Sequence, residues 1–129
     1  MEITSELKKS GQVKLDAGGR GVLQFYPDHS NQRWEVTGVV VSTDQAATAT
    51  TVPVVSLALN TVNAATASPG NAQGSSWNGN SVTFSGMTRV GECDFLAVLF
   101  APPAGASGTP LSGVIGSVVI TGTKYTRRG

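Results

Sequence analysis

Short runs of β-branched and aromatic residues alternate with clusters of turn-forming residues along most of the chain. Such runs lie at 12–16, 21–26, 33–43, 53–60, 81–87, 94–100 and 114–125. The clusters between them are rich in Gly, Pro, Asn, Asp and Ser, which favour turns. No stretch longer than about ten residues keeps a helical period. The pattern therefore predicts an all-β fold with about seven or eight strands.

Apolar residues recur at every second position in most runs, as in strands with one buried face. The residues that share a face in this way are Val13 with Leu15, Leu23 with Phe25, Val55 with Leu57 and Leu59, Val82 with Phe84, and Val114 with Val118 and Ile120. Run 94–100 is almost entirely apolar, which predicts burial on both faces. We therefore predict an antiparallel β-sandwich, either jelly-roll-like or Ig-like.

The run 33–43 is the longest one before the middle of the chain. Simple alternation places Trp34, Val36 and Val40 on one face, and Glu35, Thr37, Val39 and Val41 on the other. Gly38 in the middle of the run predicts a bulge or a close neighbouring backbone. The spacing of Trp34 is typical of a core residue.

The length of 129 residues is that of one domain. We expect an N-terminal arm at residues 1–10, a sandwich domain at 11–125 and a basic C-terminal tail at 126–129. The segment 61–80 is a long loop of small residues that holds at most one short strand. We expect this loop to cover a neighbouring chain, because long loops in compact domains tend to be functional.

The glycine-rich stretch "DAGGRGVLQF" invites comparison with a phosphate-binding loop. Such a loop needs glycines at set positions and a following helix. Gln24 stands where the third glycine is required, and a strand-forming run follows. The stretch instead predicts a hairpin turn that starts at Asp16, with positive φ at Gly18 and Gly19 and a bulge at Gly21.

Charge is low and unevenly distributed. The net charge is +1, so no global field attracts nucleic acid or an anionic membrane. Neither the segment 45–88 nor the segment 95–123 contains Asp, Glu, Lys or Arg. This favours a neutral surface for contact with other protein, or a polar Ser/Thr/Asn surface without partners. No apolar run is long enough to span a bilayer, and no secretory signal is visible, so we expect use in the cytosol or in a particle assembled there.

The chain offers few groups for catalysis or metal binding. Its single cysteine, Cys93, adjoins a strand-like run, so we expect it to be buried. The single histidine, His29, lies in a turn, and a Cys–His pair has no support in the sequence. The acidic residues Glu92 and Asp94 lie two apart, as at an exposed edge or a cation site. We predict no catalytic residues, no metal and no cofactor.

Two stretches are candidates for interaction. Trp77 and Asn78 lie in a polar loop, where a tryptophan stacks on a sugar, anchors a protein contact or caps the sandwich. Lys124, Arg127 and Arg128 form a basic C-terminus that touches an acidic partner or is simply solvated. Nucleic-acid binding is not expected, because three charges bind weakly on their own.

The order of these segments resembles a known group of proteins. "GQVKLDAGGRGVLQFYP", "RWEVTGVVVST", "PVVSLALN", "GSSWNGNSVTFSGMTRVGECDFLAVLF" and "GVIGSVVITGTKY" follow one another between residues 11 and 125. This order resembles the small β-sandwich virion proteins of actinobacterial phages. The short first segment and the nearly charge-free middle depart from that pattern, so the site in the particle stays open.

The resemblance implies a non-enzymatic structural protein of a phage virion, assembled in the host cytoplasm. We expect a capsid-decoration or minor capsid subunit that binds the major capsid protein and identical copies, with a trimer as the favoured oligomer. A tail or collar spike subunit and a carbohydrate-binding or adhesion module that uses Trp77 are the alternatives.

Overall fold

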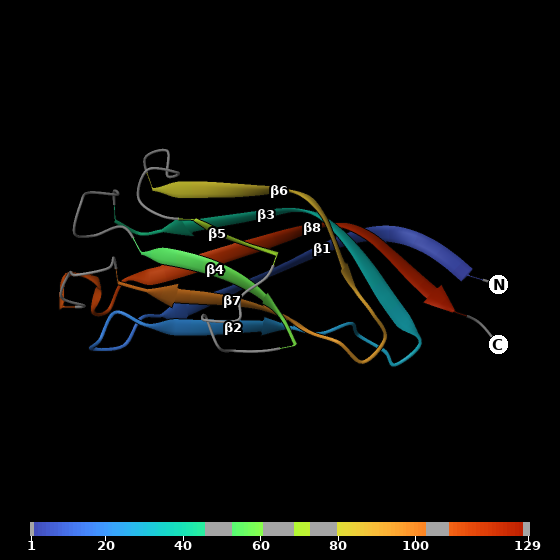
Figure 1. The fold of residues 1–129 in the computed structure, drawn as a ribbon, viewed down its shortest axis with the longest axis horizontal. Helices are drawn as coiled ribbons and strands as arrows, with labels where there is room; N and C mark the ends of the chain where they lie inside the picture. The colour runs from blue at the N-terminus through green and yellow to red at the C-terminus, as the bar shows by residue number, and fades with distance from the viewer. Residues whose placement is uncertain (1, 46–52, 61–68, 73–79, 103–108, 128–129) are drawn as a thin grey trace.

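The computed structural model describes residues 2–45, 53–60, 69–72, 80–102 and 109–127. Over these residues the chain forms strands and one short 3-10 helix (Figure 1). The strands are β1 (Glu2–Lys14), β2 (Gly21–Phe25), β3 (Gln32–Thr43), β4 (Val54–Leu59), β5 (Pro69–Ala72), β6 (Ser81–Val90), β7 (Leu96–Ala101) and β8 (Ile115–Arg127), and the 3-10 helix is η3 (Thr109–Leu111). The predicted all-β class is confirmed, and no described helix is long and apolar enough to cross a membrane.

The strands form two antiparallel four-stranded sheets. The larger sheet has the order β1-β8-β3-β6, and the smaller sheet has the order β2-β7-β4-β5. Strands from the two halves of the chain pair in nested fashion, β1 with β8, β2 with β7, β3 with β6 and β4 with β5. This nested pairing is the jelly-roll topology. The structure thus selects the jelly roll over the Ig-like alternative.

The chain differs from its predicted segments at both termini, whereas the long loop holds the one short strand that was allowed for. Residues 2–10, expected as an arm, are extended and belong to the same strand as residues 11–14, paired throughout with β8. At the other end β8 continues to Arg127, so residues 126 and 127 of the expected tail are in a strand. The short strand expected within 61–80 is β5.

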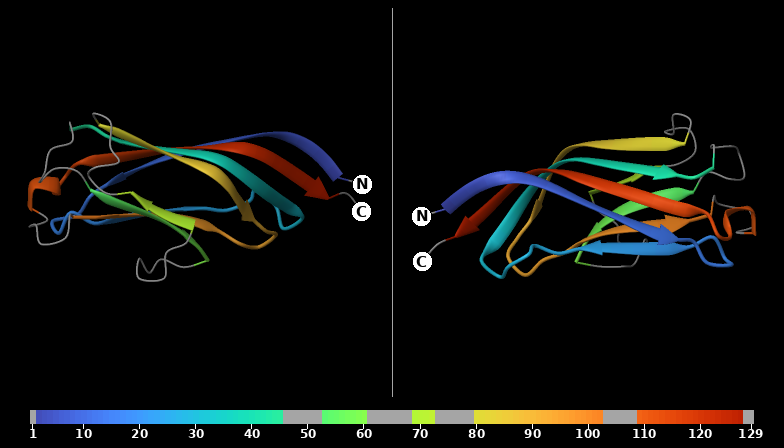
Figure 2. Two further views of the ribbon diagram at one scale, coloured as in Figure 1. Left: turned by 45° about the horizontal axis from the view of Figure 1, so that its top comes forward. Right: turned by 180° about the vertical axis from the view of Figure 1, so that it is seen from behind.

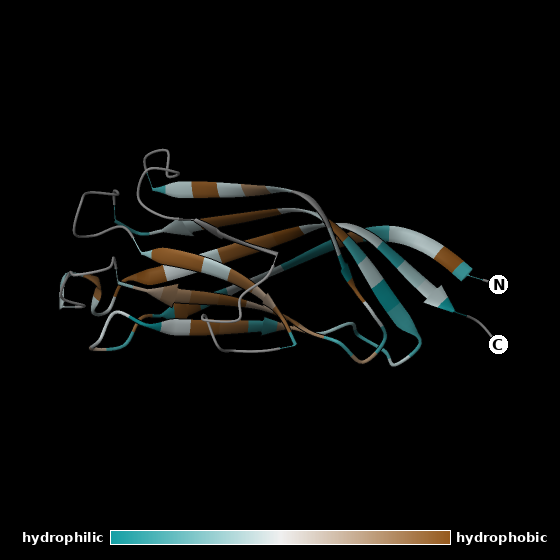
Figure 3. Cartoon of the chain, viewed as in Figure 1, coloured by the Kyte–Doolittle hydropathy of each residue, from teal (hydrophilic) through white to brown (hydrophobic). Residues whose placement is uncertain are grey.

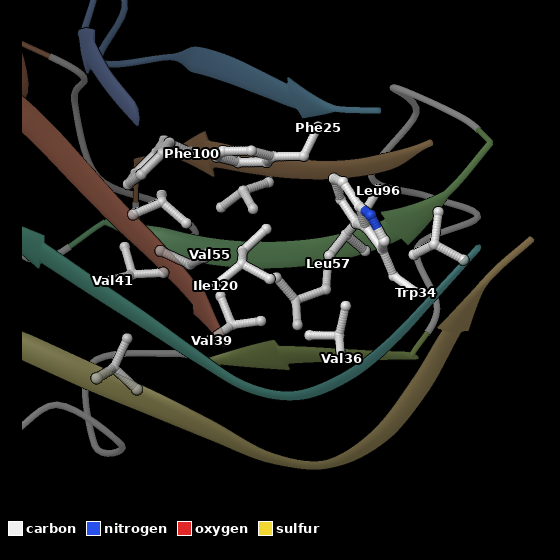
Figure 4. Close-up of a cluster of buried hydrophobic side chains, with 14 of the residues drawn as sticks. Phe25, Trp34, Val36, Val39, Val41, Val55, Leu57, Leu96, Phe100 and Ile120 are labelled. Carbon is white, nitrogen blue, oxygen red and sulfur yellow. The ribbon is translucent and has the colours of Figure 1, made fainter. Parts of the chain in front are cut away.

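Apolar side chains from both sheets meet in one core between them. Its members include Trp34 and Ile120 from the larger sheet, and Leu57 and Phe100 from the smaller sheet (Figure 4). The same-face groups expected outside the run 33–43 all contribute to this core. Strand β7 is buried on both faces from Leu96 to Phe100, as predicted. Burial of apolar surface at about 25 cal/mol per Å² is the main force that holds the two sheets together.

A bulge in β3 corrects the predicted faces of this strand. The ladders to β6 and β8 both shift register between Val36 and Gly38. The extra residue reverses the alternation, so Val39 is buried on the core side together with Val36, whereas Val40 is 39% exposed. The bulge itself was expected at Gly38. Its effect on the phase of the strand was not, and the placement of Val40 beside Trp34 was wrong.

The glycine-rich stretch is a turn between sheets and not a hairpin. Strands β1 and β2 belong to different sheets, so the predicted hairpin is wrong. The Asp16 carboxylate accepts hydrogen bonds from the backbone N–H groups of Gly18 and Arg20 at 2.8 and 3.0 Å. Gly19 has the predicted positive φ, 73°, which Gly18 does not share. The predicted bulge at Gly21 is absent, because the register between β2 and β7 is regular. Gly21 is instead a position of close packing, where a Cβ would lie 2.8 Å from the Leu15 side chain.

The larger sheet extends beyond the smaller one. Strands β1 and β8 have 13 residues each, whereas β2 has five, and Figures 1 and 2 show β1 and β8 continuing past the ends of β2, β4 and β7. We call residues 2–6 and 123–127 the overhang. Residues 2–6 are all exposed, and Figure 3 shows mostly polar colours there. The overhang therefore has no apolar core of its own.

Candidate interaction surface

Ion pairs hold the overhang to its neighbouring strands. The Arg33 guanidinium lies 3.0 Å from the Glu2 carboxylate and 3.7 Å from that of Glu35. Its central carbon is also 4.2 Å from the ring centre of Tyr125. Because Arg33, Tyr125 and Thr4 are paired across β3, β8 and β1, this arginine links all three strands. The hydrogen bond to the Glu2 carboxylate stabilises the charged guanidinium and raises the pKa of Arg33, and the nearby Glu35 carboxylate acts in the same direction.

The end of β8 is held in the same way. Arg127 forms a bidentate pair with Glu92, with an Nη2–Oε1 distance of 3.0 Å, and its backbone N–H donates to the Asn31 carbonyl at 2.8 Å. The hydrogen bond from Arg127 lowers the pKa of the Glu92 carboxyl. Arg127 is thus tied to the turn between β6 and β7, and does not belong to a loose basic tail.

A fourth ion pair, between Lys9 and Asp28, lies near the start of the overhang. Lys9 donates to the carboxylate of Asp28 and lowers the pKa of that carboxyl. The buried Gln32 side chain lies next to this pair. It accepts hydrogen bonds from the Asp28 backbone N–H and from the Trp34 indole at 3.0 and 2.9 Å, and it donates to Thr126 at 3.3 Å. These bonds satisfy the polar groups at the open end of the core.

The sequence-predicted interaction residues fall into two groups. Lys124 and Arg127 both lie on β8 in the overhang, with Lys124 half-buried opposite Ser5 and Trp34. Trp77, Asn78 and Arg128 lie outside the described residues, so the predicted sugar or protein contact at Trp77 stays a prediction. The sequence did not single out Arg33 or Glu2, which are 31 positions apart. Their pairing depends on the β1–β8–β3 register, which only the fold supplies.

The acidic side chains at positions 28, 35, 92 and 94 each have a hydrogen-bonding or ion-pair partner of their own. Asp28 pairs with Lys9, Glu35 with Arg33 and Glu92 with Arg127. Asp94 accepts hydrogen bonds from the Gly91 backbone and the Asn60 side chain at 3.1 and 3.0 Å. The described residues contain no group of three His, Cys, Asp or Glu that would hold a metal.

Cys93 lies in the turn between β6 and β7. It is exposed and has a φ of 68°. The expectation of a buried cysteine was wrong, because the turn ends before the buried part of β7 begins.

Away from the overhang, the outward face of the larger sheet is rich in small uncharged residues. One row across the strands consists of Ser10, Val119, Val40 and Thr83, and the next consists of Gln12, Ser117, Ser42 and Ser81. The outward positions of β2, which are Val22 and Gln24, are also uncharged and exposed. The larger sheet therefore carries rows of uncharged residues beside a charged overhang.

Comparison with solved structures identifies a matching fold. The chain aligns with a chain from the "Acidic stable capsid structure of Helicobacter pylori bacteriophage KHP30" with a TM-score of 0.56 and 12% sequence identity. The alignment covers 100% of this chain and 95% of the capsid chain. The two proteins thus share a fold over their whole aligned lengths. No protein-family model and no curated protein matches the sequence.

Proposed function

We propose that the protein is a non-enzymatic structural subunit of a phage virion, and that it decorates the capsid or serves as a minor capsid subunit. The observation that carries this proposal is the whole-length fold match to a chain of a phage capsid structure. The match covers both chains almost completely, so it concerns the entire jelly roll and not a shared fragment.

The surface of the described residues supports the same role. Assembly through many copies needs a surface that other protein can cover without burying unpaired charge. The rows of small uncharged residues on the larger sheet meet that need, since none of their members is charged. Many individually weak contacts with the shell and with identical copies then add by avidity.

We propose that the overhang makes contact with the neighbour. Residues 2–6 are exposed, and β8 is the strand with which their backbone is paired. Leu7, the next residue, is fully buried in the core. A neighbouring subunit thus finds an extended, polar two-stranded surface that is already ordered. A trimer is the favoured oligomer, with the major capsid protein as the second partner and the virion, assembled in the host cytoplasm, as the location.

Binding to shells of the encoding phage that lack this protein tests the proposal. The purified protein is expected to cosediment with the shells, and electron microscopy of the particles is expected to show added density on the capsid. Removal of residues 2–6 is expected to weaken cosedimentation while the protein stays folded, because the core begins at Leu7.

The control is Lys14→Ala, an exposed position on the same strand within the two-layer body that lies outside both the overhang and the uncharged rows. It is expected to bind shells like the wild type. A protein that is strictly monomeric and binds no shell would overturn the proposed role. Added density on the tail or collar would replace the capsid location.

A further inference from the structure

A two-sheet sandwich has four edge strands, and three of the four edges here carry features that oppose pairing with another chain. Edge strands with free N–H and C=O groups are templates for such pairing unless they are protected. β1 carries lysines at positions 8, 9 and 14, β5 begins with a proline, and β6 is irregular opposite the bulge in β3 and carries Arg89. Each of these features is a recognised means of protecting an edge.

The remaining edge strand, β2, has none of these protections. Its sequence is GVLQF, with no charge and no proline, and within the described ranges it is hydrogen-bonded to one strand only, β7. Of the four exposed large hydrophobic side chains among the described residues, Val22 lies on β2 and Tyr26 directly follows it, at 41% and 54% exposure. Tyr26 also packs on Phe95, with ring centres 5.3 Å apart, and donates a hydrogen bond to Gln24.

The shape of β2 fits a second copy of itself. In an antiparallel pair centred on Leu23, Gly21 of one copy is opposite Phe25 of the other, and Val22 is opposite Gln24. On the core side Gly21 and Phe25 already pack within their own copy, Gly21 against Leu15 and Phe25 in the core, so Phe25 meets no opposing side chain across the axis. On the outward side an aliphatic side chain faces the aliphatic stem of a glutamine. An uncharged edge also pairs with its own copy without like-charge repulsion.

We propose that β2 is a two-fold docking edge for a second copy of this chain, joined antiparallel about Leu23 to make one continuous eight-stranded sheet from the two smaller sheets. A two-fold contact of this kind is isologous and closed. It links two copies directly, or it links copies that belong to neighbouring trimers. The inference rests on the proposed assembly of identical copies, but the test below uses pure protein without shells.

Lysine substitution at the edge tests the contact. Val22→Lys is expected to lower the mass measured by sedimentation at high protein concentration about twofold, because two-fold pairing doubles the assembly. Ser112→Lys is the control, since Ser112 is also exposed but lies in the turn between η3 and β8, outside the edge strands, the overhang and the uncharged rows of the larger sheet. Gln24→Lys is a second edge variant, and thermal melting checks that all three variants are folded.

Cysteine cross-linking tests the register. In a Cys93→Ser background, oxidation is expected to link Val22→Cys chains to Gln24→Cys chains when the two are mixed. Neither variant is expected to form the link by itself, since each position faces the other across the axis. Directly opposed positions have the Cβ spacing that a disulfide needs.

The proposal is overturned if the wild type shows no association, if Ser112→Lys lowers the mass as much as Val22→Lys does, or if cross-links form within single-variant samples as readily as in the mixture. Shell binding with no β2 pairing removes only this inference, whereas β2 pairing with no shell binding leaves it intact and removes the virion role.

Discussion

Two glycines occupy backbone positions that a side chain would strain. Gly19 has a φ of 73° in the turn between β1 and β2, and its N–H donates to the Asp16 carbonyl at 2.9 Å. Gly122 lies within β8, where a Cβ would come within 2.0 Å of the Glu35 carbonyl oxygen. The first glycine is needed for its dihedral angle and the second for the close approach of β3 at the bulge.

Gly19→Val is expected to lower the free energy of unfolding by about 1–3 kcal/mol, because a β-branched residue is forced toward positive φ. Gly18→Val is the matched control, since Gly18 lies next to Gly19, is exposed and does not have a positive φ. Denaturant unfolding of the two variants measures the difference. Equal stability of Gly19→Val and the wild type would show that the turn has a different conformation.

At the scale of the element, β3 shows how one inserted residue changes the face of a strand. Before the bulge, Trp34 and Val36 point into the core, and after it Val39 and Val41 do so. The strand therefore contributes buried residues along its full length, while the Arg33 and Glu35 side chains point outward and hold the overhang. With a strict period of two, Val39 and Val41 would lie on the face opposite Trp34 and Val36, outside the core.

Adjacent valines on β3 test this geometry. Val39→Asp is expected to lower the free energy of unfolding by about 3 kcal/mol or more, because it buries an unpaired carboxylate. Val40→Asp is expected to cost at most about 1 kcal/mol, since Val40 faces solvent and the main loss is β-propensity. The two valines are neighbours on one strand and differ in exposure, 3% for Val39 and 39% for Val40, so they form a matched pair. Urea unfolding of both variants gives the comparison, and a reversed order would contradict the bulge.

At the scale of the whole molecule, stabilisation is divided between an apolar core and a polar overhang. The two-layer body is held by side chains buried between the sheets, whereas the overhang depends on strand pairing and on the ion pairs of Arg33 and Arg127. Exposed ion pairs contribute little individually. The overhang is therefore the part of the described molecule whose order depends most on pH and salt.

Acidification is expected to weaken the ion pairs. The pKa values of Glu92 and Asp28 are below their ordinary values of 4.5 and 3.8 in the folded protein. The unfolded chain thus takes up protons first, so their stabilisation is complete above the ordinary pKa values and is lost as pH falls through the lowered ones. Between pH 7 and about pH 3, the melting temperature of the double variant Asp28→Asn/Glu92→Gln is expected to fall less than that of the wild type.

Glu6→Gln is the control for this measurement, because Glu6 is an exposed carboxylate on β1 outside these two ion pairs. It is expected to follow the wild-type pH profile closely. The same loss of melting temperature in the wild type and the double variant would show that the two pairs do not stabilise the fold.

The sequence by itself determined the strand content, most strand positions and most core residues. Period-two spacing and turn formers are local signals, so Leu23 with Phe25, and Val118 with Ile120, were assigned to the core without knowledge of their partners. The bulge at Gly38 was also visible as a glycine within a strand.

Only the tertiary structure decided which strands pair, and with that the sites that depend on pairing. Whether "DAGGRG" joins paired strands or crosses between sheets depends on where β7 and β8 lie, far along the chain. The ion pair of Arg33 with Glu2 depends equally on the β1–β8–β3 register. Alternation along one strand records which side chains are buried, but it carries no information about the neighbour across the hydrogen bonds, because backbone groups pair in the same way whatever the side chains are.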